Sequence, residues 1–379
     1  MATTDALIVG GGIAGLASAL TLHRRGLRPL VLERAPALAE IGAGLQVTPN
    51  GMAVLRGLGL DALVARRGVP AEAVEPHDAL TGRRLARFPV PSPGRWVFIR
   101  RTALLDVLAR AMDEAGLPLR TGTPVDSSVP GAVVTAGGER LAAPLVVGAD
   151  GIRSVLRAGL LTEAGPTFAG QVAWRALVRA PHDPVARIWM APGRHVVTYP
   201  LGEGWTNLVA VREERGWAEE GWHLRDSPDA LRAAFADVAP PLAAILARVE
   251  ETGRWGLFRR PVPLRWHDAT RVLVGDAAHP TLPFLAQGAN LALEDAWVLA
   301  REVGRGGRLD EALARYQAQR RPRVVRAVAA ADANARNYHL RGLSRRAAAL
   351  ALTAVGLVAP AAFLRRYAWL HGHDVTAAG

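Results

Sequence analysis

The chain has 379 residues and 50% of them are apolar, which allows two domains with sizeable cores and excludes an intrinsically disordered protein. It contains no cysteine, which excludes disulfides, thiolate metal sites and a cysteine nucleophile, and which fits a cytoplasmic protein. The formal net charge is +12, and the chain contains no lysine, so its basic residues are arginines.

The arginines are spread along the chain instead of clustering on one element, so we expect no nucleic-acid partner. The densest run comprises Arg320, Arg321, Arg323 and Arg326. We interpret this run as a solvated helix face in preference to a functional patch.

The N-terminal region predicts a β-α-β unit. Residues 4–9 are nearly all apolar, which is typical of a strand buried on both faces. A glycine-rich turn follows, residues 16–25 predict a helix that ends at Gly26, and residues 30–32 predict a second strand.

The glycines of this turn are Gly10, Gly12 and Gly15. The first allows the tight turn, the second lets the backbone approach a pyrophosphate, and the third lets helix and strand pack closely. The N-terminus of the helix then faces the phosphates. Glu33, 18 residues after the last glycine, would accept hydrogen bonds from a ribose hydroxyl. The unit therefore predicts a dinucleotide site.

The middle of the chain changes character. Residues 97–112 predict a strand end and a helix, and residues 132–147 predict a hairpin that leads into a strand. Residues 168–213 are rich in strands, at 172–178, 185–190, 195–199 and 206–211, and residues 228–250 are helical. This block lacks β-α alternation, so we expect a separate substrate-binding sheet.

The last third predicts a buried strand at 271–274 and helices at 289–302 and 309–336. Residues 347–364 carry no charge, but they are rich in alanine and contain Gly356 and Pro360. Alanine contributes little to membrane insertion and proline breaks a helix, so we expect no membrane association. We predict one or two buried C-terminal helices, which could take part in a subunit contact.

Two further glycine motifs follow predicted strands. One is Val-Gly-Ala-Asp-Gly-Ile-Arg-Ser at 147–154, and the other is Val-Gly-Asp-Ala-Ala-His-Pro at 274–280. Asp276 in the second motif can accept hydrogen bonds from ligand hydroxyls, and a helix N-cap is its alternative role.

The three motifs, in this order, resemble those of the single-component (group A) FAD-dependent aromatic hydroxylases, and the resemblance covers essentially the whole chain. Residues 10–15 resemble the FAD fingerprint of that family. Asp150 and Gly151 resemble its second motif, which contacts both FAD and the nicotinamide cofactor. Gly275 and Asp276 resemble its third motif, whose aspartate binds the FAD ribityl chain.

The finer resemblance is to the salicylate and 3-hydroxybenzoate hydroxylase branch. It rests on residues 41–50 with Gln46, on Arg101, on residues 283–296, on residues 338–340 and on residues 369–374. The branch often has tyrosine where this chain has His371.

This resemblance implies an α/β fold: a Rossmann-like FAD-binding domain with a parallel sheet, of the GR2, p-hydroxybenzoate hydroxylase type, carrying an inserted, mainly antiparallel β-sheet substrate domain and C-terminal helices. Residues 1–70, 97–167 and 270–340 would form the discontinuous FAD-binding domain. Residues 71–96 and 168–269 would form the substrate-binding domain, and residues 341–379 a helical tail.

The resemblance also implies which residues bind the cofactor. The N–H groups of the first turn of the helix that begins at Gly288 would stabilise negative charge on the reduced flavin. The expected FAD-binding residues are Gly10, Gly12, Gly15, Glu33, Arg34, Gln46, Arg101, Val125, Asp150, Asp276, Gly288, Ala289 and Asn290. No metal-ligand spacing is present, and we expect no metal.

The implied activity is that of an FAD-dependent monooxygenase. It would use NADH or NADPH and O2 to hydroxylate a phenolic or other aromatic substrate through a flavin C4a-hydroperoxide. The alternatives are a tailoring hydroxylase or epoxidase of a larger natural product, and a flavin dehydrogenase without oxygen insertion. The family and the apolar tail suggest a homodimer.

The catalytic prediction starts from the phenol, which reacts better as a phenolate and so needs a base with a pKa near neutral. His195 and Tyr199 lie four residues apart on a predicted strand, which places both side chains on one face. In the resembled branch such a pair lines the substrate pocket, so His195 is the expected base and Tyr199 its hydrogen-bonding partner for the substrate. Gln287 would hold the substrate from the flavin side, and His279 is interpreted as structural or adjacent to the flavin.

Overall fold

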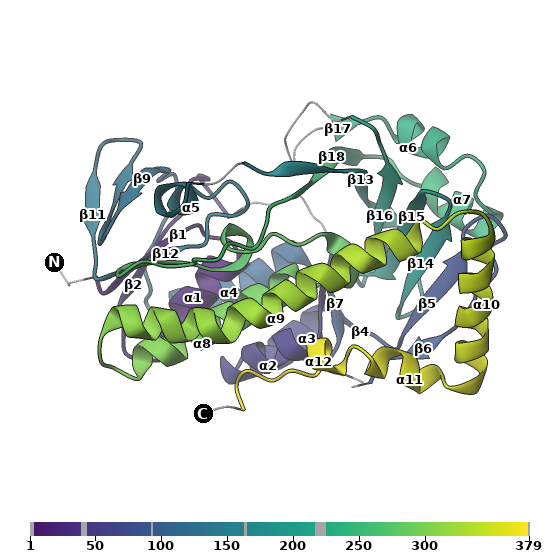
Figure 1. Ribbon diagram of the computed structural model, residues 1–379. Coiled ribbons are helices and arrows are strands. Elements are labelled where there is room, and N and C mark those ends of the chain that lie inside the picture. The colour runs from purple at the N-terminus through teal and green to yellow at the C-terminus, as the bar shows by residue number, and fades with distance from the viewer. Residues whose placement is uncertain (1–3, 39–43, 92–93, 163–164, 217–224, 378–379) are drawn as a thin grey trace.

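The computed structural model describes residues 4–38, 44–91, 94–162, 165–216 and 225–377. Residues 41–43 of the loop that resembles the hydroxylase branch therefore lie outside the described residues. Two large sheets dominate the molecule (Figure 1).

The first large sheet is parallel and five-stranded. Its order is β19 (Arg271–Leu273), β12 (Leu145–Gly148), β1 (Ala6–Val9), β2 (Pro29–Leu32) and β8 (Leu119–Arg120). All four residues of β1 are buried, as the apolar run predicts for a central parallel strand.

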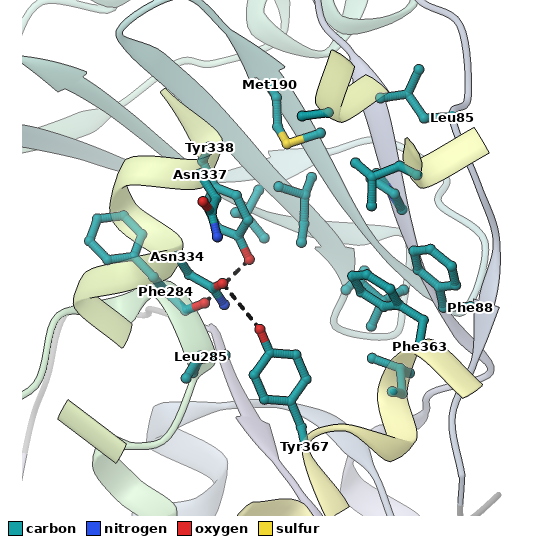
Figure 2. Close-up of a pocket in the computed structure, with 18 of the residues that line it drawn as sticks. Leu85, Phe88, Met190, Phe284, Leu285, Asn334, Asn337, Tyr338, Phe363 and Tyr367 are labelled. Atoms are coloured by element: carbon teal, nitrogen blue, oxygen red, sulfur yellow. Dashed lines mark hydrogen bonds between the residues drawn. The ribbon is translucent and has the colours of Figure 1, made fainter. Parts of the chain in front are cut away.

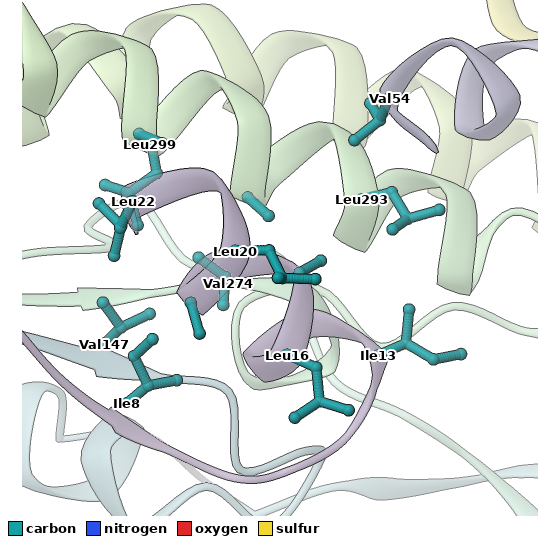
Figure 3. Packing of buried hydrophobic residues seen from close by; sticks show 14 of the residues in the cluster. Ile8, Ile13, Leu16, Leu20, Leu22, Val54, Val147, Val274, Leu293 and Leu299 are labelled. Atoms are coloured by element: carbon teal, nitrogen blue, oxygen red, sulfur yellow. The ribbon is translucent and has the colours of Figure 1, made fainter. Parts of the chain in front are cut away.

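Long helices cover this sheet. They are α1 (Ile13–His23), α4 (Arg101–Glu114), α8 (Gly288–Gly304) and α9 (Leu309–Tyr338). Figure 3 shows part of the core between the sheet and these helices, where Ile8 and Val147 of the strands and Leu16 and Leu20 of α1 lie among other apolar side chains. This core fixes the strand ends that carry the glycine motifs.

The second large sheet is eight-stranded and mainly antiparallel. Its order is β17 (Arg225–Asp226), β18 (Thr252–Arg259), β13 (Thr167–Arg179), β16 (Trp205–Glu213), β15 (Arg194–Pro200), β14 (Val185–Ala191), β5 (Ala73–Asp78) and β6 (Phe88–Pro89). The separate sheet predicted from residues 168–213 is therefore present. Helices α6 (Pro228–Ala234) and α7 (Pro240–Ala247) pack on it through Leu231 and Leu242.

Two small sheets and several short helices accompany the two large sheets. One small sheet contains β11 (Arg140–Ala142), β10 (Ala132–Thr135) and β9 (Val125–Val129), and another contains β3 (Gly44–Val47), β7 (Val97–Arg100) and β4 (Val69–Pro70). The remaining helices before the tail are α2 (Pro49–Gly57), α3 (Asp61–Arg67), α5 (Val155–Leu160) and the 3-10 turns η1 (Gly275–Ala277) and η2 (Pro283–Leu285).

The C-terminal tail contains α10 (Gly342–Val358), α11 (Pro360–Arg365) and α12 (Ala368–His371). The prediction of buried helices is wrong for α10, which has no buried residue among those described. Leu343, Leu350 and Leu357 are 80%, 69% and 81% exposed, because only the opposite side of this helix packs on the protein. None of the helices in the described ranges is long and apolar enough to cross a membrane.

The interpretation of the arginine run as a solvated face is also wrong for two of its members. Arg320 is almost completely buried and pairs with Glu294 and Asp295 of α8, with Nε lying 2.7 Å from Asp295 Oδ1. Arg323 is largely buried and lies 2.7 Å from Glu294. The acidic partners are supplied by α8, so this face of α9 pairs with protein instead of water.

Candidate active site

The three glycine motifs meet at one edge of the parallel sheet. In the register, Val9 lies beside Gly148, and Gly148 lies beside Leu273. The motifs therefore follow the carboxyl ends of three adjacent strands, β1, β12 and β19. This edge is where open α/β sheets bind their ligands.

The first motif has the geometry that its glycines predict. Gly10 has φ +109°, and a Cβ there would lie 2.3 Å from the carbonyl oxygen of Ala149. A Cβ on Gly15 would lie 1.8 Å from the carbonyl oxygen of Gly10, so α1 and β1 require glycine for close packing. By contrast, a Cβ on Gly12 would meet no described atom within 4 Å. The open side of the turn is therefore at Gly12, the position expected to face a pyrophosphate.

Glu33 follows β2 and lies against the same turn. Its Oε2 accepts a hydrogen bond from the backbone N–H of Gly11 at 2.6 Å, and Oε1 accepts from Ala35 at 2.8 Å. The carboxylate is thus held beside the glycine turn, where a ribose would lie. Arg34 is exposed next to it, and Val125 begins β9 in the small sheet.

The second motif places Asp150 at the start of α5. Its Oδ2 accepts from the backbone N–H groups of Val155 and Leu156 at 2.7 and 3.2 Å. Its Oδ1 is buried and accepts no hydrogen bond from the described residues. Burial raises the pKa of Asp150.

The third motif places Asp276 in η1, close to the N-terminus of α8. Its Oδ1 lies 3.9 Å from the position that a Cβ on Gly288 would take. Burial among surrounding protein atoms raises the pKa of Asp276, and the nearby charges of His279 and Arg101 act against this rise. The side chain nevertheless remains accessible from the open side.

Helix α8 begins at Gly288, as predicted. Gly288, Ala289 and Asn290 form its first turn, whose N–H groups have no partners within the helix. The Asn290 side chain joins this turn to β3, because its Nδ2 donates to Gln46 O at 3.0 Å and its Oδ1 accepts from Thr48 N at 3.0 Å.

These observations fit a flavin dinucleotide. The open glycine turn suits a pyrophosphate, Asp276 suits ribityl hydroxyls, and the first turn of α8 suits the electron-rich edge of a flavin ring. The fold and these groups define a dinucleotide-binding protein. A separate cavity lies beside its second sheet.

That cavity has a volume of about 450 Å³ and lies between the large antiparallel sheet, η2 and the C-terminal helices. Figure 2 shows Phe284 and Leu285 of η2 on one side and Phe88 and Phe363 on the other, with Met190 of β14 above. The lining is mostly apolar, which suits an aromatic ring.

Several polar groups in the cavity wall have hydrogen-bonding partners within the protein. The Tyr338 hydroxyl donates to Phe284 O at 3.4 Å, and the Tyr367 hydroxyl donates to Asn334 Oδ1 at 3.2 Å (Figure 2). Arg345 of α10 lies 2.7 Å from Asp78 of β5.

Gln287 immediately precedes the first turn of α8 and is buried in a hydrogen-bonded network. Its Oε1 accepts from Asn50 Nδ2 at 3.0 Å, and its Nε2 donates to Thr48 Oγ1 at 3.0 Å and to His371 Nδ1 at 3.2 Å. His371 lines the cavity and packs beside Trp96. Burial lowers the pKa of His371 to about 4, so the ring is neutral at pH 7 and carries its proton on Nε2.

His195 and Tyr199 share one face of β15, as predicted, and both are buried. Neither is among the residues that line the cavity. The His195 ring packs against Phe284 and Tyr338, and both of these residues line the cavity. Tyr199 stacks on Phe98, and burial raises the pKa of its hydroxyl.

His279 is fully buried and its Nε2 lies 2.5 Å from Asp295 Oδ2. The same oxygen accepts from the backbone N–H of Gly275 at 2.9 Å. This histidine links the third motif to the charged residues of α8 and α9, in agreement with its interpretation as a structural residue.

Comparisons with known proteins agree with this site. A family model described as an FAD binding domain matches residues 3–331. A 3-amino-4-hydroxybenzoate 2-monooxygenase from Streptomyces cremeus is 36% identical over 351 residues, which cover 88% of this chain and 87% of that protein. A 3-hydroxybenzoate 6-hydroxylase from Klebsiella oxytoca is 32% identical over 360 residues, covering 90% of each.

Solved structures show the same fold. HpxO from Klebsiella pneumoniae, crystallised with FAD and uric acid, superposes with a TM-score of 0.81 at 26% identity and covers 93% of each chain. A salicylate hydroxylase substrate complex superposes with a TM-score of 0.81 at 23% identity over 99% of this chain and 97% of that one. Because the model of the FAD-binding-domain family matches residues 3–331, the chain belongs to that family.

Sequence reasoning missed two residues beside the cavity. His371 was noted only as a departure from tyrosine, and that departure is the signal that could have drawn attention to it. His339 lies 2.8 Å from His195 and belongs to residues 338–340, which resemble the hydroxylase branch, but its contact with His195 has no signal in the sequence because 144 positions separate the two residues.

Proposed function

We propose that this FAD-dependent aromatic monooxygenase uses NAD(P)H and O2 to hydroxylate a phenolic ring bound in the 450 Å³ cavity. The observation that carries the proposal is the position of the cavity, which is lined by η2 directly before the first turn of α8. The relatives named as acting on hydroxybenzoates favour this reaction over a flavin dehydrogenase without oxygen insertion.

Bound FAD would take the reducing equivalents from NAD(P)H and activate O2, and the protein would supply binding, orientation and proton transfer. The proposed FAD-binding residues are the thirteen predicted from the sequence. Of these, Gly12 and Asp276 have the most direct support, because Gly12 has open space at its Cβ position and Asp276 is exposed at the strand ends.

The chain's own residues would orient the phenol. Neutral His371, with its proton on Nε2, would donate a hydrogen bond to a substrate oxygen, while Gln287 holds the ring in that tautomer. His195 would take the phenol proton, and Tyr199, whose raised pKa keeps it protonated, would act as a donor. The apolar wall would exclude water.

Three further properties are part of the proposal. NADH or NADPH would bind transiently, and the protein would be cytoplasmic, in keeping with its lack of cysteine. Two copies would pair through the exposed leucines of α10, whose seven-residue spacing forms one stripe. Size-exclusion chromatography of Leu350→Glu should then give a monomer where the wild type gives a dimer, and a monomeric wild type would contradict the pairing.

The activity is tested with FAD-loaded protein and a panel of phenolic acids and neutral phenols. NADH and NADPH oxidation is followed, and mass spectrometry detects an added oxygen. We expect one ring to stimulate oxidation and to gain one oxygen atom. Ring-independent reduction of another electron acceptor, with no oxygenated product, would show a dehydrogenase instead.

A further inference from the structure

His195 is the inner end of a line of three hydrogen-bonded side chains. His195 Nδ1 lies 2.8 Å from His339 Nε2, and His339 Nδ1 lies 3.2 Å from Glu213 Oε1. Glu213 comes from the end of β16, and His339 directly follows α9. The line therefore joins three elements and leads from the cavity wall toward the surface.

The inner end of the line lies next to residues of the cavity wall. His195 pairs across the sheet with Met190 of β14, so both side chains share one sheet face, and Met190 lines the cavity. Val197, two residues along β15, lies on the same face and also lines the cavity. His195 thus neighbours several lining residues, and its ring contacts those of Phe284 and Tyr338.

The outer end reaches solvent. The Glu213 side chain is 43% exposed, and its other oxygen accepts a 2.5 Å hydrogen bond from Arg341. His339 itself is buried. A proton that reached Glu213 could therefore leave to bulk water.

The hydrogen-bonding partners determine the tautomers. A carboxylate only accepts, so His339 Nδ1 carries a proton and His339 Nε2 carries the lone pair. His195 Nδ1 must then donate to His339, which leaves the lone pair of His195 on Nε2. The line thus presents the tautomer that a general base needs, in the way an acid-histidine pair orients a catalytic histidine.

Gln171 agrees with this assignment when its side-chain amide is turned by 180°, because its donor Nε2 now faces the protonated Nδ1 of His339. Its Nε2 lies 3.4 Å from His339 Nδ1, and its buried Oε1 has no partner among the described residues. Turning the amide would place Oε1 where it accepts from the Nδ1 proton as well.

The charges of the resting line follow from burial. Burial lowers the pKa of His195 well below its usual value, and the neighbouring His339 lowers it further. Burial also lowers the pKa of His339, against the opposing effect of Glu213. Partial burial would raise the pKa of Glu213, but the hydrogen bond from Arg341 and the proximity of His339 outweigh it and lower the value. Both rings are neutral at pH 7 and the carboxylate is ionised.

We propose that His339 and Glu213 form a proton path that carries the substrate's phenolic proton from His195 to solvent. The inference rests on the proposed function. The phenol O–H bond breaks as a proton binds His195 Nε2, the Nδ1 proton of His195 moves to His339 Nε2, and the Nδ1 proton of His339 moves to Glu213. No redox change occurs, and no imidazolium remains in the buried wall.

The path also has to reset. After the forward transfer each ring carries its proton on the other nitrogen. When the product forms as a phenolate, a proton entering at Glu213 runs the same transfers in reverse and restores the resting tautomers. One proton leaves and one returns in each cycle, so the protons balance.

The test replaces His339 with glutamine, which keeps a hydrogen-bonding side chain but cannot relay a proton. The readouts are ionisation of the bound phenol, measured by ultraviolet difference spectroscopy, and the pH profile of hydroxylation. We expect little phenolate at pH 7 and a rate at least about tenfold lower, within the range of general-base effects. The rate should recover as pH rises, and added imidazole should restore part of it.

The matched control is His182→Gln. His182 is another largely enclosed histidine bonded to β15, with Nε2 2.9 Å from Thr198 Oγ1, but it lies outside the line. It should leave phenol ionisation and the pH profile unchanged. Glu213→Gln keeps an acceptor for the Nδ1 proton but removes the outer proton acceptor, and it should slow the reaction in the same pH-dependent way.

The outcomes separate the path from the function on which it rests. If the wild type hydroxylates and His195→Gln abolishes phenol ionisation while His339→Gln keeps it, the path is wrong and the function stands. A pH-independent loss in His339→Gln, without imidazole rescue, would show a purely structural role. If no phenol supports oxygenation by the wild type, the proposed function fails and the path fails with it.

Discussion

At the scale of single residues, the glycines of the first motif serve two different purposes. One allows the protein to pack, and another leaves room for a ligand. Gly15 is needed by the protein itself, because α1 packs against the carbonyl of Gly10. Gly12 has an ordinary φ of −77° and open space around its Cβ position, so folding alone does not require glycine there. A ligand that approached the backbone from that side would require glycine at this position.

This difference predicts opposite behaviour for two alanine variants. The free energy of unfolding of Gly12→Ala should lie within about 0.5 kcal/mol of the wild-type value, but the variant should bind FAD at least about tenfold more weakly. Gly15→Ala should lose about 3 kcal/mol or more of stability through overpacking. Urea unfolding of the FAD-free proteins and fluorescence titration with FAD measure the two effects. Unchanged FAD affinity in Gly12→Ala would remove the glycine turn from the cofactor site.

At the scale of elements, α8 and α9 are joined by buried charges that also reach the third motif. Arg320 of α9 pairs with Glu294 and Asp295 of α8, and Asp295 in turn holds His279 and the backbone of Gly275. The arrangement fixes η1, and with it Asp276, relative to the first turn of α8.

Removing Arg320 should therefore lower the stability of the protein strongly. Arg320→Ala leaves Asp295 buried without a guanidinium and leaves Glu294 with Arg323 alone, and we expect a loss of about 3–5 kcal/mol in the free energy of unfolding. Arg326→Ala, on the exposed side of the same helix, loses only a contact with Trp369 and should cost about 1 kcal/mol or less. Urea denaturation compares the two, and equal losses would contradict a role for the buried pairs.

These elements also show what sequence can and cannot predict here. The strands, the glycine turn and the shared face of His195 and Tyr199 follow from local periodicity, and the structure contains them. The burial of Arg320 and the exposure of α10 depend on what another element supplies: α8 supplies two acids, and no described element covers the leucines. The partner of His195 is equally non-local, since only the packing of α9 against the sheet brings His339 to it.

At the scale of the whole molecule, histidine burial couples stability to pH. Burial lowers the pKa of His182 and His371 to about 4, and it also lowers the pKa of His195 and His339. In the unfolded chain the pKa of each of these histidines is about 6.5. The unfolded state therefore binds more protons than the native state between about pH 4 and 6.5, so stability rises with pH across this window. Asp150 and Asp276, with raised pKa values, act in the opposite direction.

His182 isolates one such contribution, because it lies outside both the cofactor site and the proposed proton path. Its ring is held neutral between Asp183 O at 2.7 Å and Thr198 Oγ1 at 2.9 Å, and protonation would have to overcome its burial. Between pH 7.5 and 5.5 the wild type should lose about 1 kcal/mol more stability than His182→Gln, because the variant has no proton to take up on unfolding at this position. Urea unfolding at the two pH values measures the difference. An equal pH dependence in both proteins would mean that His182 is protonated as readily in the native state as in the unfolded chain, and that its burial does not contribute to acid sensitivity.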